Sequence, residues 1–147
     1  MYRYLLQESS NKYNIKIRNV GTNKVVFGGS SMWTSIDSIN SLAQGNVTIV
    51  SDKLQILNGN EGTANSWTLQ MPALQELYLN SKDYTGDLIF SRNAAVQSPA
   101  LRIIDISNSK INLNVDSQNV RTINLTNVKS GSIQIRNCSL IQNVVFN

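Results

Sequence analysis

The stretch Ile104-Asp-Ile106-Ser-Asn108 decides the fold of this chain, because the same phrase returns along its C-terminal two thirds. In each copy, two apolar residues separated by one position are followed, two positions after the second, by Asn or Ser. The copies are Leu54–Asn58, Leu77–Ser81, Ile104–Asn108, Ile123–Asn127 and a shorter Val144–Asn147. Their period of roughly 20–27 residues is typical of proteins built from stacked coils.

Two further features accompany each copy. A lead apolar residue stands three positions before the phrase, and a second short segment of alternating polarity follows it. The lead residues are Leu74, Leu101, Val120 and Ile141, and the second segments are Trp67–Met71, Leu88–Phe90, Ile111–Val115 and Ile133–Ile135. Each coil therefore has two predicted strands, which stack in parallel on the next coil and turn their alternate apolar residues inward.

The polar residue that ends the phrase marks the turn out of the first strand. A buried backbone group without a hydrogen bond costs about 1–3 kcal/mol, and an Asn side chain can both donate to and accept from such groups. Stacked coils would bring these side chains into a ladder that supports the turns. The predicted ladder residues are Asn58, Ser81, Asn108 and Asn127.

The first 45 residues do not repeat, and they predict a cap on a repeat array that covers 46–147 in about four to five coils. Alternation at Tyr13–Arg18 and a second run at Lys24–Phe27 flank a turn at Val20–Asn23, which predicts a β-hairpin. Apolar residues at three- and four-residue steps from Met32 to Ala43 predict a helix over 32–44, with Gly45 as its terminator.

The phrase resembles the leucine-rich repeat L-x-x-L-x-L-x-x-N. The segments Leu101–Asn108 and Val120–Asn127 carry the resemblance, although the Asn comes one position earlier than in that pattern. The likeness is closer to short bacterial-type repeats and to parallel β-solenoids. It implies a mainly β, short right-handed parallel β-solenoid behind a hairpin-and-helix cap, and such arrays serve mostly as binding scaffolds.

The composition argues against the usual catalytic and metal chemistries. The 147 residues contain no histidine and one cysteine, Cys138, which excludes Ser-His-Asp and Cys-His catalysis in their usual forms. The acidic residues, among them Asp83, Asp87 and Asp105, are scattered rather than paired. We therefore expect a protein that is not an enzyme and that uses no cofactor and no metal.

The net charge of +4 is too small by itself to indicate nucleic acid as a partner. No apolar run reaches the roughly 20 residues of a membrane helix, and the N-terminus does not read as a signal peptide. The expected location is a virion or a bacterial cytoplasm, without a membrane association.

Three groups of residues are candidates for interaction. The outward positions of the main sheet form a candidate face, for which the alternative is a merely solvated polar surface; they are Tyr78, Asn80, Asp105, Asn124 and Thr126. Basic residues follow the ladder, either to meet an acidic partner or to keep the sheet edge soluble; they are Lys82, Lys110 and Lys129, with Arg102 and Arg121 also in register. The last copy of the phrase is a candidate assembly edge, formed by Ile141, Val144 and Phe146.

These features favour a non-catalytic structural or interaction protein whose partners are other protein subunits, in a homo- or hetero-oligomer. The specific hypothesis is a small accessory or decoration subunit of a bacteriophage virion that docks on a larger assembly. One alternative is a module that binds a glycan or a host protein through the outward sheet face, and another is a bacterial intracellular regulator resembling leucine-rich-repeat proteins.

Overall fold

The computed structural model of the chain is mainly β, with parallel strands in three sheets. It describes residues 13–16, 22–27, 35–40, 43–51, 55–59, 62–91 and 100–147, and this part of the chain contains no helix. A membrane-spanning helix is accordingly not found among these residues.

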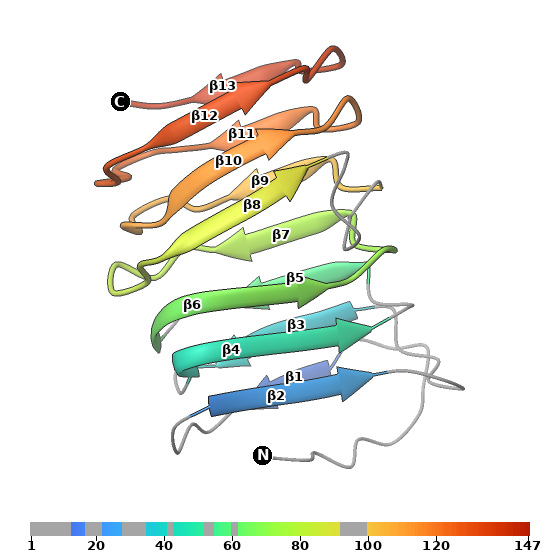
Figure 1. Cartoon of the computed structure of the whole chain (residues 1–147), viewed down its shortest axis with the longest axis vertical. Helices are drawn as coiled ribbons and strands as arrows, with labels where there is room; N and C mark the ends of the chain where they lie inside the picture. The colour runs from blue at the N-terminus through green and yellow to red at the C-terminus, as the bar shows by residue number, and fades with distance from the viewer. Residues whose placement is uncertain are drawn as a thin grey trace.

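Odd-numbered strands make one sheet and even-numbered strands make the other two. The seven-stranded sheet contains, in spatial order, β1 (Tyr13–Lys16), β3 (Ser35–Asn40), β5 (Ile56–Gly59), β7 (Glu76–Leu79), β9 (Ile103–Asp105), β11 (Thr122–Asn124) and β13 (Asn143–Val145). The three-stranded sheets contain β2 (Thr22–Phe27), β4 (Ala43–Ser51) and β6 (Gly62–Gln70), and β8 (Asp87–Ser91), β10 (Asn112–Asp116) and β12 (Ile133–Arg136). Figure 1 shows the even-numbered strands in front of the odd-numbered ones, with successive strands rising from the N-terminus to the C-terminus.

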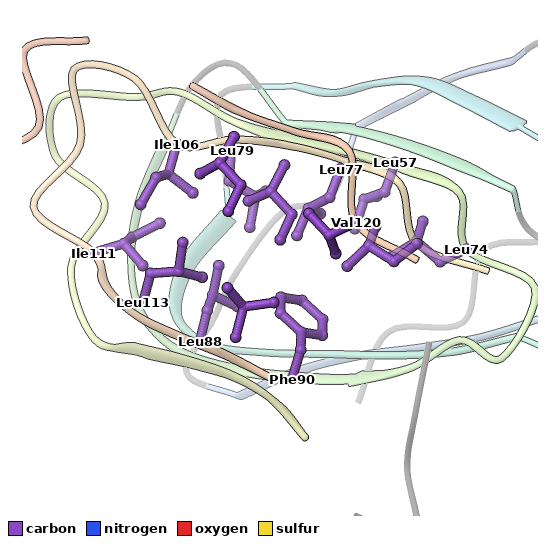
Figure 2. Packing of buried hydrophobic residues seen from close by; sticks show 14 of the residues in the cluster. Leu57, Leu74, Leu77, Leu79, Leu88, Phe90, Ile106, Ile111, Leu113 and Val120 are labelled. Atoms are coloured by element: carbon purple, nitrogen blue, oxygen red, sulfur yellow. The ribbon is translucent and has the colours of Figure 1, made fainter. Parts of the chain in front are cut away.

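The core lies between the two layers. One apolar residue of each strand stacks in register through the large sheet, as Leu57, Leu77, Ile104, Ile123 and Val144. In the last four this is the first apolar residue of the phrase, but Leu57 takes that place instead of the predicted Leu54, so the copy Leu54–Asn58 was aligned three positions out of register. In Figure 2, Leu79 and Ile106 of this layer face Leu88, Leu113 and Phe90 of the other. The predicted lead residues Leu74, Leu101 and Val120 have no exposed surface. Period-2 alternation therefore sets both strand type and core, as the sequence predicts.

Two predictions for the N-terminal segment are wrong. The helix predicted over 32–44 is replaced by β3 and the start of β4, and β3 pairs in parallel with β5. The predicted hairpin does not form either, since β1 pairs with β3 in the large sheet while β2 pairs with β4 in another. In β3, Ile36 aligns with Leu57, so pairing with the neighbouring strand β5 overrides a helical spacing that was only local.

The layer of even-numbered strands, which lies in front in Figure 1, is interrupted between β6 and β8, because these two strands belong to different sheets. Near the break, the Thr85 amide still donates to the Ala64 carbonyl (3.0 Å), but the Thr85 carbonyl accepts from the indole N–H of Trp67 (3.0 Å). The Trp67 ring meets the buried Tyr84 edge-on, with ring centroids 4.8 Å apart. A side chain thus supplies the hydrogen bond that a continuous ladder would take from backbone.

Gly86, which follows this contact, is confined by its neighbours. Its φ is +93°, and a Cβ built there would lie 2.1 Å from the Asn65 carbonyl oxygen. A side chain at this position would meet both backbone strain and a clash with backbone atoms that cannot rotate away.

We expect Gly86→Ala to lower the free energy of unfolding by about 2–3 kcal/mol, measured by urea denaturation. The control is Gly131→Ala, where the nearest atom to an added Cβ is the Asn112 side-chain oxygen at 3.7 Å. That variant should change stability by less than about 0.5 kcal/mol. Equal effects of the two substitutions would contradict this account of the break between β6 and β8.

Candidate interaction surfaces

The outward face of the large sheet brings three of the predicted contact residues into one row. Tyr78 aligns with Asp105, and Asp105 aligns with Asn124, on β7, β9 and β11. Asn80 and Thr126 lie just beyond the ends of β7 and β11. All five side chains are partly exposed.

Tyr78 is held by a charged pair on the same face. Its hydroxyl donates to the Glu76 carboxylate (2.6 Å), whose other oxygen accepts from Arg102 Nη2 (3.3 Å). Partial burial, followed by the hydrogen bond and charge of Glu76, raises the pKa of Tyr78 to about 12, so the phenol is neutral at ordinary pH. The sequence prediction omitted Glu76, although Glu76 stands two positions before Tyr78 and so shares its face. It named Arg102, but as part of a basic edge rather than as a partner of Glu76.

Asp105 and Asn124 are also committed to local hydrogen bonds. Asp105 Oδ1 accepts from the Ser107 amide (2.9 Å) and Asn124 Oδ1 from the Thr126 amide (3.0 Å), which makes each an Asx turn that ends its strand. Asn124 Nδ2 donates to Asp105 Oδ2 (3.4 Å). This face is therefore a preorganised polar surface that uses many of its own donors and acceptors.

Two of the asparagines that end the phrase, Asn108 and Asn127, lie at turns between the layers. Asn108 and Asn127 have φ of 65° and 56°, the left-handed conformation that Asn tolerates better than most residues. Each turn is closed by an amide-to-carbonyl bond, from Ser109 to Ile106 (3.2 Å) and from Val128 to Leu125 (3.1 Å). A backbone requirement is thus one reason for Asn at this place.

Among the predicted ladder residues, one pair is joined by a side-chain hydrogen bond, and the others have different partners. Asn127 Nδ2 donates to Asn108 Oδ1 (3.3 Å), and the Asn127 amide donates to Asn147 Oδ1 (3.1 Å). Ser81 Oγ instead donates to the Gly62 carbonyl (2.9 Å). Asn58 lies within β5, aligned with Tyr78, and so occupies the outward row rather than a turn.

Another asparagine that the sequence prediction missed organises the loop before β12. Asn112 Oδ1 accepts from the amides of Gly131 (3.0 Å) and Ser132 (3.1 Å), while its Nδ2 donates to Asp87 Oδ1 (2.9 Å). Its partners are 19 to 25 positions away along the chain, so no local pattern indicated this role.

The predicted lysines lie beside the asparagine turns. Lys82, Lys110 and Lys129 are exposed and line one open hollow of about 420 Å³ together with Asp83, Asn108 and Asn127. Arg102 is elsewhere, on the outward face with Glu76. The structure therefore separates the basic residues into different surfaces.

The C-terminal end of the stack combines exposed apolar side chains with strand edges. Phe146 is 67% exposed, and Val145 and Leu140 are nearly half exposed, whereas Ile141 and Val144 are partly buried against the core. A second hollow here is lined by Leu125, Val128, Ser130, Ile133, Ile135, Phe146 and Asn147. β12 and β13 are the outermost strands of their sheets at this end.

Among the described residues, no three His, Cys, Asp or Glu side chains lie close enough together to hold a metal ion. The Cys138 thiol is buried, and it donates to the Arg136 carbonyl oxygen (3.2 Å). Comparison with protein-family models, with curated proteins and with solved structures finds no match to this chain.

The two roles of Asn108 can be separated by substitution. We expect Asn108→Ala to cost about 1–2 kcal/mol of unfolding free energy, because it loses both the side-chain contact and the tolerance of positive φ. Asn108→Gly, which keeps the backbone conformation accessible, should cost roughly half as much. Thermal and urea unfolding would measure both.

The control for these substitutions is Asn143→Ala, at an exposed strand position without positive φ, which should change stability by less than about 0.5 kcal/mol. Equal stability of Asn108→Ala and the unchanged protein would contradict both roles of Asn108.

The Tyr78 phenol provides a pH test of the outward face. Its folded pKa of about 12 exceeds the ordinary value of 10.0, so its contribution to stability is complete below pH 10 and is lost as the pH rises toward 12. The difference in tyrosinate absorbance between the unchanged protein and Tyr78→Phe should titrate with a midpoint near 12. Glu76→Gln should lower that midpoint, and a Tyr78 midpoint of 10 in the unchanged protein would contradict the geometry.

Proposed function

We propose that the chain is a parallel β-solenoid in which each coil gives one strand to the large sheet and one to the opposite layer. The alternation of odd and even strands between layers, with every strand pair parallel, supports this architecture. The resemblance to short leucine-rich repeats supports it from the sequence side, through Leu101–Asn108 and Val120–Asn127. In such an array each coil depends on its neighbours for burial.

We propose that the protein is a non-catalytic interaction protein that docks on another protein subunit through its C-terminal end. The observation that carries this proposal is the combination at that end of an exposed Phe146, an apolar hollow and the outer strands β12 and β13. Exposed apolar patches and strand edges are surfaces on which other protein segments pair. The partner that fits them is a segment that supplies apolar side chains and backbone hydrogen-bonding groups together.

The setting we propose is a larger particle, with this chain as a small accessory or decoration subunit of a bacteriophage virion. Its support is the low content of charged residues, 15%, and a repeat that suits a compact building unit. The outward sheet face is a weaker candidate for the principal binding surface, because Tyr78, Asp105 and Asn124 already hydrogen-bond to their neighbours.

Sedimentation velocity over a range of concentrations, with copurification from the native source, tests the docking end. We expect the unchanged chain to self-associate at high concentration or to be enriched in purified particles. Val145→Thr combined with Phe146→Ser should weaken that association, because it removes the most exposed apolar groups at this end.

The control is Ile89→Ser on β8, which removes a side chain of similar exposure, 60%, from a different surface. This substitution should leave association unchanged. A chain that stays monomeric at every concentration and is absent from particles would overturn the proposal, as would an equal effect of Ile89→Ser.

A further inference from the structure

The parallel register places two lysines, Lys110 and Lys129, at equivalent positions beside the asparagine turns. The Lys110 amide donates to the Tyr84 carbonyl (2.9 Å), and the Lys129 amide donates to the Ser109 carbonyl (2.9 Å). Lys110 and Lys129 thus occupy equivalent places on successive coils, separated by about the 4.8 Å spacing of neighbouring strands. Lys82 comes from the turn of the coil before them, and Figure 1 shows the loops leading into β8, β10 and β12 one above another on the left.

These lysines differ from Arg102 in forming no ion pair with a described residue. In the part of the chain that the structure describes, the ion pair is that of Arg102 with Glu76, and none forms at Lys82, Lys110 or Lys129. Their hollow contains one carboxylate, Asp83, against three ammonium groups, a formal charge of +2. Stacked like charges repel one another, so an anion in the hollow would remove a cost that the free protein carries.

The shape and chemistry of the hollow select among anions. Its volume of about 420 Å³ lies within the usual range for ligand sites, and its positive groups are arranged along the stack rather than around one point. Asn108 and Asn127 add amide groups, which hydrogen-bond to sugar hydroxyls as well as to carboxylates. An extended ligand with one negative charge per unit, and units about as long as the strand spacing, would match this row.

Nucleic acid fits the hollow less well. Binding of single strands relies on aromatic side chains that stack on the bases, and the lining residues include none. Tyr84, the aromatic residue nearest in sequence, has no exposed surface. The hollow also lacks arginine, whose planar fork is favoured for phosphate.

We propose that this hollow binds a carboxylated polysaccharide, laid along the stack with its carboxylates against Lys82, Lys110 and Lys129. This hollow shares no lining residue with the C-terminal hollow, and its test measures ligand binding rather than association, so the inference stands or falls independently of the proposed docking function.

The test is binding of an oligogalacturonate to the whole chain, measured by calorimetry at low and moderate salt, with a neutral maltooligosaccharide of equal length for comparison. We expect the acidic sugar alone to bind, more weakly as salt increases. Lys110→Gln with Lys129→Gln should lower the affinity at least about tenfold. Lys110→Arg with Lys129→Arg should retain binding because the charges remain.

The matched control is Arg121→Gln with Arg136→Gln, which removes the same charge from exposed residues outside the hollow. It should change the affinity less than about twofold. Equal losses from the lysine and arginine pairs would overturn the proposal, because attraction would then depend on net charge alone. No binding of oligogalacturonate, or equally tight binding of a single-stranded oligonucleotide with the same number of charges, would also overturn it.

Discussion

The parallel register between neighbouring strands of each sheet is the constraint on which the rest of the structure depends. Leu57, Leu77, Ile104, Ile123 and Val144 form one inward row because each strand pairs with the next without a shift. A slip of one residue would turn Tyr78 and Asp105 into the core and the leucines outward. The free energy gained by burying this row therefore decides which side of each strand faces the core and which side faces outward.

The surface side chains recur with the same spacing as the core residues. The kinds of side chain differ, however, between the outward sheet face and the turns. On the outward sheet face, Asp105 and Asn124 end their strands by accepting hydrogen bonds from nearby amides. At the turns, the same register brings Lys110 and Lys129 to equivalent positions, and neither forms an ion pair with a described residue. The polar side chains of the outward sheet face hydrogen-bond to one another and to nearby amides, whereas the lysines at the turns form no ion pair with a described residue. This difference supports the proposal that an anionic ligand binds at the turns.

Two places depart from the regular pairing of strands, namely the break between β6 and β8 and the C-terminal end. Between β6 and β8 the front layer breaks, and Trp67, Thr85 and Gly86 rebuild the contact with a side-chain donor and a close backbone approach. At the C-terminal end, β12 and β13 leave apolar groups such as Phe146 exposed. Exposed apolar groups and outer strands are surfaces on which other protein segments pair, which supports the proposed docking end.

The amino-acid sequence by itself determined the strands from residue 76 onward and the core between them, whereas the copy Leu54–Asn58 was predicted out of register with β5. Period-2 alternation and the recurring phrase are local signals, and burial of Leu74, Leu101 and Val120 follows from them. The sequence also predicted Asn108 and Asn127 as turn residues. Part of the reason for Asn at these two positions is the positive φ of the backbone.

Only the tertiary structure decided how the N-terminal strands pair and which distant side chains meet. Around Ile36 the three- and four-residue spacing favoured a helix, but pairing with β5 made this segment a strand. Glu76 reaches Arg102 across 26 positions, and Asn112 holds a loop 19 positions away. Contacts at such separations depend on how the strands pair. That pairing is set by the burial of whole rows of side chains rather than by any local run of residues.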